Sequence, residues 1–174
     1  MVASVRAFRK QIRPIEAPEP LREAFEPANE PVHPGSKLLT EFWRAREAAG
    51  GFVVGRDVPS RALAKVLQNL ALFEPVVCST GVTDLRVRLA GDGLRLRFGR
   101  DVTGEKLSEL FDHEEFDMHI AQTRIALNAG SPLFLRSELR HGSLVERRLE
   151  IVILPVWNRT RTERWILAGI FYFV

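Results

Sequence analysis

The final segment of the chain, Glu163–Val174, constrains the fold more than any other stretch. A strand over these residues has apolar side chains on both faces. They are Trp165, Leu167, Phe171 and Phe173 on one face and Ile166, Ala168, Ile170 and Tyr172 on the other. Because successive side chains of a strand point to opposite sides of a sheet, this strand needs apolar cover on both sides. The sequence therefore predicts that it lies in the middle of a covered sheet.

Four further strands are predicted upstream of this segment. Leu72–Ser79 and Thr83–Ala90 are joined closely enough to form a hairpin, and Pro75 indicates a sheet edge or a bulge in the first of them. Leu133–Arg140 and Leu144–Trp157 follow later in the chain and are joined by a tight turn. The chain thus supplies five strands.

Three helices of more than one or two turns are predicted between these strands. They are Lys37–Ala49 after an N-cap at Ser36, a helix from Pro59 to about Leu70, and His113–Ala129 after a capping box of Asp112 and Glu115. Thr103–Phe111 is predicted as a further short helix, while the apolar alternation in Gly91–Phe98 fits a strand or a short capped helix equally well.

The helix Lys37–Ala49 carries more apolar side chains than one narrow stripe holds. They are Leu38, Leu39, Phe42, Trp43 and Ala45. Such a helix needs two partners or a second copy of itself. The order of elements predicts an α+β fold, in which helices crowd one face of an antiparallel sheet. We expect the helix Lys37–Ala49 to cover the other face, alone or together with a second subunit.

The chain divides into an N-terminal arm and one domain. Residues 1–35 contain six of the ten prolines, a density that disfavours both helices and strands. We expect this arm to be extended or disordered, and residues 36–174 to form the domain.

Composition excludes several classes of protein. The formal net charge of +3 comes from arginines scattered along the chain, without the basic stripe and interleaved aromatics of a nucleic-acid-binding surface. The single cysteine fits a reducing compartment, and no apolar run is long enough to span a membrane. We expect a cytoplasmic protein with no nucleic-acid or membrane partner.

Catalytic and metal-binding motifs are missing from the sequence. There is no G-x-S-x-G, and Gly91-Asp-Gly lacks the third glycine of a dinucleotide-binding loop. The segment H-E-E-F-D-M-H, residues 113–119, is not a zincin motif, because Asp117 stands where the second histidine is required. The sequence predicts neither an enzyme nor a metal site.

Four short motifs carry a resemblance to a known family. They are Phe42-Trp-Arg-Ala-Arg, Val58-Pro-Ser-Arg, Arg88-Leu-Ala-Gly and Phe98-Gly-Arg-Asp-Val-Thr-Gly. With the order of elements, they resemble the PAS domain, and more narrowly a group of short stand-alone bacterial PAS proteins. The family residues in these motifs are Trp43, Arg88, Gly91, Phe98, Gly99, Arg100 and Gly104. The resemblance implies a five-stranded antiparallel sheet in the order 2-1-5-4-3, a helical N-terminal extension, and a helix rather than a strand at Gly91–Phe98.

The resemblance also implies a function. We expect a non-catalytic sensory or regulatory module that acts in signal transduction through protein–protein contacts, since the chain ends with the sheet and no effector segment follows. The expected partners are an unknown signalling protein and a second copy of the chain, with the homodimer formed through helix 36–49 and the sheet face.

The alternative function is a small-molecule sensor with a pocket between the sheet and the long helix. The residues predicted to line it are Val87, Leu89, Phe116, His119, Ile120 and Ile153. The ligand is a metabolite, or a haem held by His119; no cofactor is predicted as required. Arg86 and Arg88 share one strand face and need either an anion or carboxylates, for which Glu138, Glu146 and Glu150 are the candidates.

Overall fold

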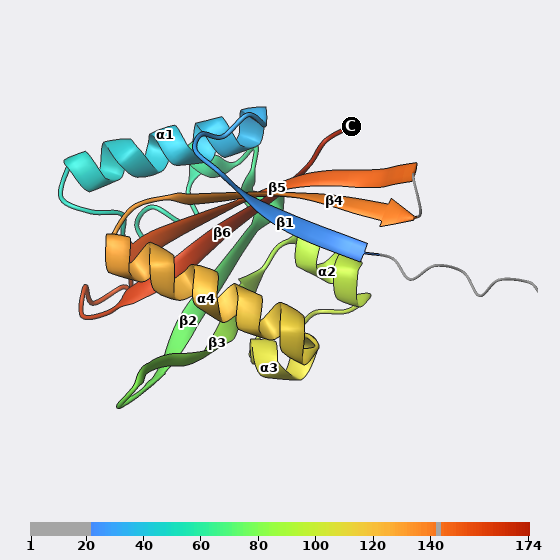
Figure 1. Cartoon of the computed structure of the whole chain (residues 1–174). Helices are drawn as coiled ribbons and strands as arrows, with labels where there is room; N and C mark the ends of the chain where they lie inside the picture. Colours follow the sequence, from blue (N-terminus) through green and yellow to red (C-terminus); the bar gives the residue numbers. More distant parts are fainter. Residues whose placement is uncertain (1–21, 142–143) are drawn as a thin grey trace, which may run out of the picture.

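The computed structural model describes residues 22–141 and 144–174, which contain one six-stranded antiparallel sheet in the order β1-β4-β5-β6-β2-β3 (Figure 1). The strands are β1 (Arg22–Ala28), β2 (Leu70–Cys78), β3 (Gly81–Ala90), β4 (Leu133–His141), β5 (Leu144–Trp157) and β6 (Arg164–Tyr172). The helices are α1 (Pro34–Ala48), α2 (Asp92–Phe98), α3 (Leu107–Leu110) and α4 (His113–Ala129). In this part of the chain, no helix is both long and apolar enough to cross a membrane.

Strand β6 lies between β5 and β2, so its two apolar faces are both covered. Leu167 and Phe171 pack into the core on the α1 side, while Ile166 and Ala168 pack into the core on the opposite side. Figure 1 shows α1 and α4 on opposite sides of the sheet. The described part of the chain is therefore a three-layer structure with two apolar cores.

Helix α1 is the cover of one face. Leu39 and Trp43 are buried against the sheet, and the Trp43 indole Nε1 donates a hydrogen bond to the Pro155 carbonyl at 2.8 Å. Leu38 and Phe42 are half-buried and pack against the same core. The apolar surface of this helix is thus largely satisfied within the chain.

Helices α2, α3 and α4 cover the other face. Asp112 is the N-cap of α4 and accepts a hydrogen bond from the Glu115 N–H at 2.9 Å, and Gly130 ends the helix with a φ of 61°. The predicted bounds of this long helix, His113–Ala129, are confirmed, because both of its end signals act locally.

Two helix predictions were wrong in detail. The segment after Pro59 forms two 3₁₀ helices, Arg61–Leu63 and Leu67–Asn69, instead of one α-helix. Its backbone N–H groups donate to carbonyls three residues back. The three-residue spacing puts Leu63 and Val66 on the same side, and both are buried. Helix α1 begins before Ser36, with His33 as its N-cap: the His33 imidazole accepts from the Gly35 N–H at 3.0 Å.

The sixth strand was not predicted. Strand β1 comes from the proline-rich arm and pairs antiparallel with β4, from Arg22 opposite Arg140 to Ala28 opposite Phe134. It lies at the end of the sheet, where Pro27 is tolerated because an edge strand does not need every N–H. The remainder of the predicted arm, residues 1–21, lies outside the described residues.

Candidate functional site

The connector between β3 and β4 begins with a helix whose ends require glycine. A Cβ on Gly91 would lie 2.4 Å from the Gln68 carbonyl oxygen and 2.5 Å from that of Leu70, so only glycine allows this approach. Gly99 ends α2 with a φ of 67°, a conformation that favours glycine. Gly91–Phe98 is therefore helical rather than a strand, and the Phe98 ring packs edge-on against Phe111 at 5.3 Å.

The two arginines of the family motifs anchor this connector. Arg88 Nε lies 2.6 Å from a Glu74 carboxylate oxygen, and its guanidinium lies 5.7 Å from the centre of the Trp165 ring. Arg100 pairs with Glu105, and the hydrogen bond and charge of Arg100 lower the pKa of that carboxyl despite some desolvation. Gly104, with a φ of 93°, donates its N–H to the Val87 carbonyl at 2.8 Å. These family residues have structural roles.

Arg86 and Arg88 contact groups other than Glu138 and Glu150, while the side chain of Glu146, the third carboxylate suggested from the sequence, lies outside what the structure describes. Arg86 Nη1 donates to the Gly104 carbonyl at 3.0 Å, and Arg88 pairs with Glu74. Glu138 pairs instead with Arg140 and Arg148, and Glu150 with Arg136. Both guanidinium groups thus have partners within the protein, and no anion is needed to account for them.

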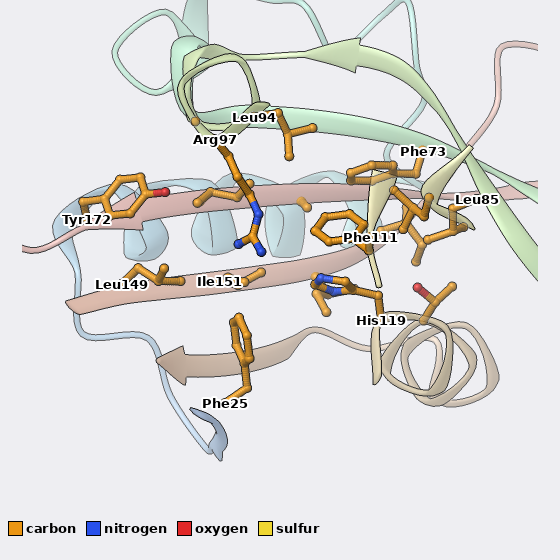
Figure 2. A pocket seen from close by; sticks show the side chains of 17 residues that line it. Phe25, Phe73, Leu85, Leu94, Arg97, Phe111, His119, Leu149, Ile151 and Tyr172 are labelled. Carbon is orange, nitrogen blue, oxygen red and sulfur yellow. The ribbon is translucent and has the colours of Figure 1, made fainter. Parts of the chain in front are cut away.

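A cavity lies between the sheet and the helices α2, α3 and α4 (Figure 2). Its volume is ≈ 80 Å³, more than one water needs and about half that of an engineered apolar cavity of about 150 Å³ that binds benzene. Its walls are mostly apolar, with aromatic rings from Phe25, Phe73, Phe111 and Tyr172 and aliphatic side chains from β5 and β6. Such an apolar cavity with a few polar groups is the usual form of a small-ligand site.

Two of the six residues predicted to line a pocket do so, namely His119 and Ile153. Val87 and Ile120 are buried in the core beside the cavity, and Phe116 is half-buried against that core. Leu89 lies on the opposite face of the sheet, with the α1 core.

The position of Leu89 results from a β-bulge. Val87 is opposite Phe73 and Leu89 is opposite Leu72. Between these two pairs β3 advances by two residues while β2 advances by one. The extra residue, Arg88, breaks the strict alternation and turns Leu89 to the other face. The sequence pattern had placed Leu85, Val87 and Leu89 on one face.

Several lining residues were missed by the sequence reasoning. Phe25 belongs to the unpredicted strand β1, and Arg97 lies on α2, where the sequence alternation allowed two conformations. Figure 2 shows the Arg97 guanidinium pointing into the cavity, and it lies 5.1 Å from the centre of the Phe111 ring. No local signal marks these side chains as neighbours.

The polar wall of the cavity is formed by α2 and α4. Arg97 Nη2 lies 2.5 Å from Glu115 Oε1, and His119 Nε2 lies 3.5 Å from the same oxygen. The His119 ring packs at 4.8 Å from the Phe111 ring and 6.1 Å from the Phe25 ring. Thr123, one turn further along α4, also lines the cavity. This arrangement offers hydrogen bonds to a bound molecule.

A haem does not fit this arrangement. A volume of ≈ 80 Å³ is too little for the macrocycle, and the His119 ring already packs against the Phe25 and Phe111 rings. Within residues 22–141 and 144–174, no group of three or more His, Cys, Asp or Glu side chains could hold a metal ion.

Comparisons with known proteins agree with the resemblance seen in the sequence. A family model described as PAS domain matches residues 32–171. That range contains every helix named above, strands β2 to β5 and all of β6 except its last residue, Tyr172, whereas β1 lies outside it. Neither the curated proteins nor the solved structures gave a match. Since the matched range is most of the chain, the protein belongs to the PAS domain family.

Proposed function

We propose that this protein is a sensory module that binds a small molecule in the cavity between the sheet and helices α2 to α4, and passes the signal on through protein–protein contacts. The observation that carries the proposal is the cavity itself. Protein interiors are normally close-packed, so an apolar space with polar side chains on one wall favours a binding role. Membership of the PAS family, which suggests a sensory or signalling role, supports the same function.

Strand β1 is the proposed route from the cavity to the surface. Its Phe25 lines the cavity and packs against His119, while the strand itself forms one end of the sheet. A ligand that moves the Phe25 ring therefore changes how β1 sits on β4. The exposed edge and outer face of this strand are then the surfaces that a signalling partner reads.

The proposed role contains no catalytic step. The polar side chains at the cavity are an ion-paired arginine, an imidazole and hydroxyl groups. Each of them can orient a ligand by hydrogen bonding, which is sufficient for a sensor.

The test compares two matched tryptophan substitutions. Ile151 lines the cavity, and Ile151→Trp should fill it; Ile125 is 51% exposed on α4, and Ile125→Trp should leave the cavity open. Small molecules are extracted from the purified proteins and identified by mass spectrometry, and a metabolite library is screened by thermal shift.

We expect at least one compound to co-purify with or stabilise the wild type and Ile125→Trp, but not Ile151→Trp. A compound that stabilises all three proteins equally binds elsewhere. If no compound distinguishes Ile151→Trp from the other two proteins, the cavity is not a ligand site and the proposal fails.

A further inference from the structure

Thr123 brings an unused hydrogen-bonding group to the cavity. This residue of α4 is 2% exposed and lines the cavity, yet its hydroxyl makes no hydrogen bond to the described residues. By contrast, the buried Thr40 of α1 donates its hydroxyl to the Ser36 carbonyl at 2.7 Å. A hydroxyl both donates and accepts, so Thr123 offers a position for a polar group of the ligand at the cavity wall.

His119 lies one turn before Thr123, on the same side of α4. Residues four apart on a helix are neighbours, and both of these line the cavity. The imidazole contacts Glu115 at 3.5 Å but makes no hydrogen bond to the described residues. A neutral imidazole donates at one nitrogen and accepts at the other, and a threonine hydroxyl does both. Together they suit a ligand group that itself donates and accepts, which is a hydroxyl.

The charges at the cavity favour an uncharged ligand. Arg97 is the one lysine or arginine among the described lining residues, and its charge is already balanced by Glu115 at 2.5 Å. Its guanidinium also lies 5.1 Å from the centre of the Phe111 ring. A ligand carboxylate would lose its hydration and would have to compete with Glu115 for the same cation.

The size and the walls of the cavity define the body of the ligand. An engineered apolar cavity of about 150 Å³ binds benzene, so a cavity of ≈ 80 Å³ limits the ligand to a body of at most about one ring. Phe25, Phe73 and Phe111 present aromatic surfaces to this space, and the β5 and β6 residues are aliphatic.

We propose that the cavity binds a small, uncharged molecule with an apolar body of about one ring and one hydroxyl group, which hydrogen-bonds to Thr123 and His119. This inference rests on the proposed function, because it takes the cavity as the ligand site.

The test uses three probes of nearly the same shape: 4-methylphenol, p-xylene and 4-methylbenzoate. Their dissociation constants are measured by calorimetry or NMR titration against the wild type, Thr123→Val and Thr40→Val. Valine is nearly isosteric with threonine, and Thr40 is buried in the α1 layer, away from the cavity. Thr40→Val is therefore the matched control for losing a buried hydroxyl.

We expect 4-methylphenol to bind the wild type about five- to tenfold more tightly than p-xylene. This is the ratio of dissociation constants that one net hydrogen bond produces. The carboxylate should bind most weakly. Thr123→Val should bring the affinity for 4-methylphenol close to that for p-xylene and leave p-xylene unchanged, whereas Thr40→Val should change neither affinity.

Three results overturn the inference. If 4-methylbenzoate binds most tightly, the ligand class is anionic. If 4-methylphenol and p-xylene bind the wild type with equal affinity, the cavity makes no hydrogen bond to the ligand hydroxyl. This comparison uses the wild type alone, so it does not depend on whether a variant folds. If none of the three binds, the stated class is wrong. In each case the proposed function is decided separately, by extraction and by the Ile151→Trp variant.

Discussion

The buried carboxylate of Glu150 fastens the start of α1 to the sheet, and removing its charge should destabilise the fold. Glu150 lies on β5 with no exposed surface. Its oxygens accept hydrogen bonds from the N–H groups of Val32, at 3.0 and 3.1 Å, and His33, at 3.0 Å, and from Arg136 Nε at 3.3 Å. Hydrogen bonds to a charged group contribute about 1.5–3 kcal/mol each. Glu150→Gln keeps one acceptor oxygen but turns the other into a donor that faces these donors.

We expect Glu150→Gln to lower the free energy of unfolding by about 3 kcal/mol at pH 7. The control is Glu138→Gln on the neighbouring strand β4, where a carboxylate with 36% side-chain exposure pairs with Arg140 and Arg148. Exposed ion pairs contribute about 0–1 kcal/mol, so this variant should change stability little. Urea unfolding followed by tryptophan fluorescence measures both.

The pH dependence gives a second check on Glu150. Burial raises its pKa, but hydrogen bonds, among them those from the Val32 and His33 N–H groups, outweigh that effect and hold the pKa below its ordinary value. A carboxyl whose pKa is lower in the folded state stabilises the fold above its unfolded pKa of about 4.3. That contribution is lost as the pH falls through the folded pKa. The free energies of unfolding of the wild type and Glu150→Gln should therefore converge at acid pH. This account is refuted if their difference grows at acid pH, or if at pH 7 it is no larger than the difference between the wild type and Glu138→Gln.

Further predictions concern the family motif residues and the assembly. Gly91→Ala should lower the free energy of unfolding by about 2–3 kcal/mol, because the new Cβ would lie within 2.5 Å of two backbone carbonyl oxygens. Gly99→Ala should lower the free energy of unfolding by about 1 kcal/mol, because the site has room for a Cβ and only the φ of 67° is unfavourable for alanine. Urea unfolding measures both, and equal effects would contradict the distinction. Trp43→Phe removes a buried hydrogen bond and part of the α1 core, and should cost about 2 kcal/mol by the same assay. Light scattering at micromolar concentration tests the predicted homodimer; a monomer contradicts it.

Features that depend on nearby residues could be predicted from the sequence. The bounds of α4 follow from Asp112 and Gly130, each of which acts within one turn of the helix. The need for cover on both sides of β6 follows from its own alternation, and β6 lies inside the sheet. The motifs from Arg88 to Gly104 identify the family because they fix the turns and ion pairs of the connector.

The cavity could be predicted only in outline. His119 and Ile153 were found because each lies on the inward face of a long regular element. Leu89 was misplaced, because the bulge that turns it depends on the register of β3 against β2. Side chains that meet by tertiary packing leave no periodic signal, and Phe25, Arg97 and Tyr172 come from three elements far apart in the chain.

The sequence by itself determined the α+β class, the long helix and the central covered strand, since these depend on periodicity and on caps within a few residues. The tertiary structure alone decided that Arg22–Ala28 becomes an edge strand, because its hydrogen bonds come from β4, more than a hundred residues away. It also decided which side chains enclose the cavity. Contacts of that kind form only when distant segments meet, so the candidate site belongs to the fold rather than to any stretch of sequence.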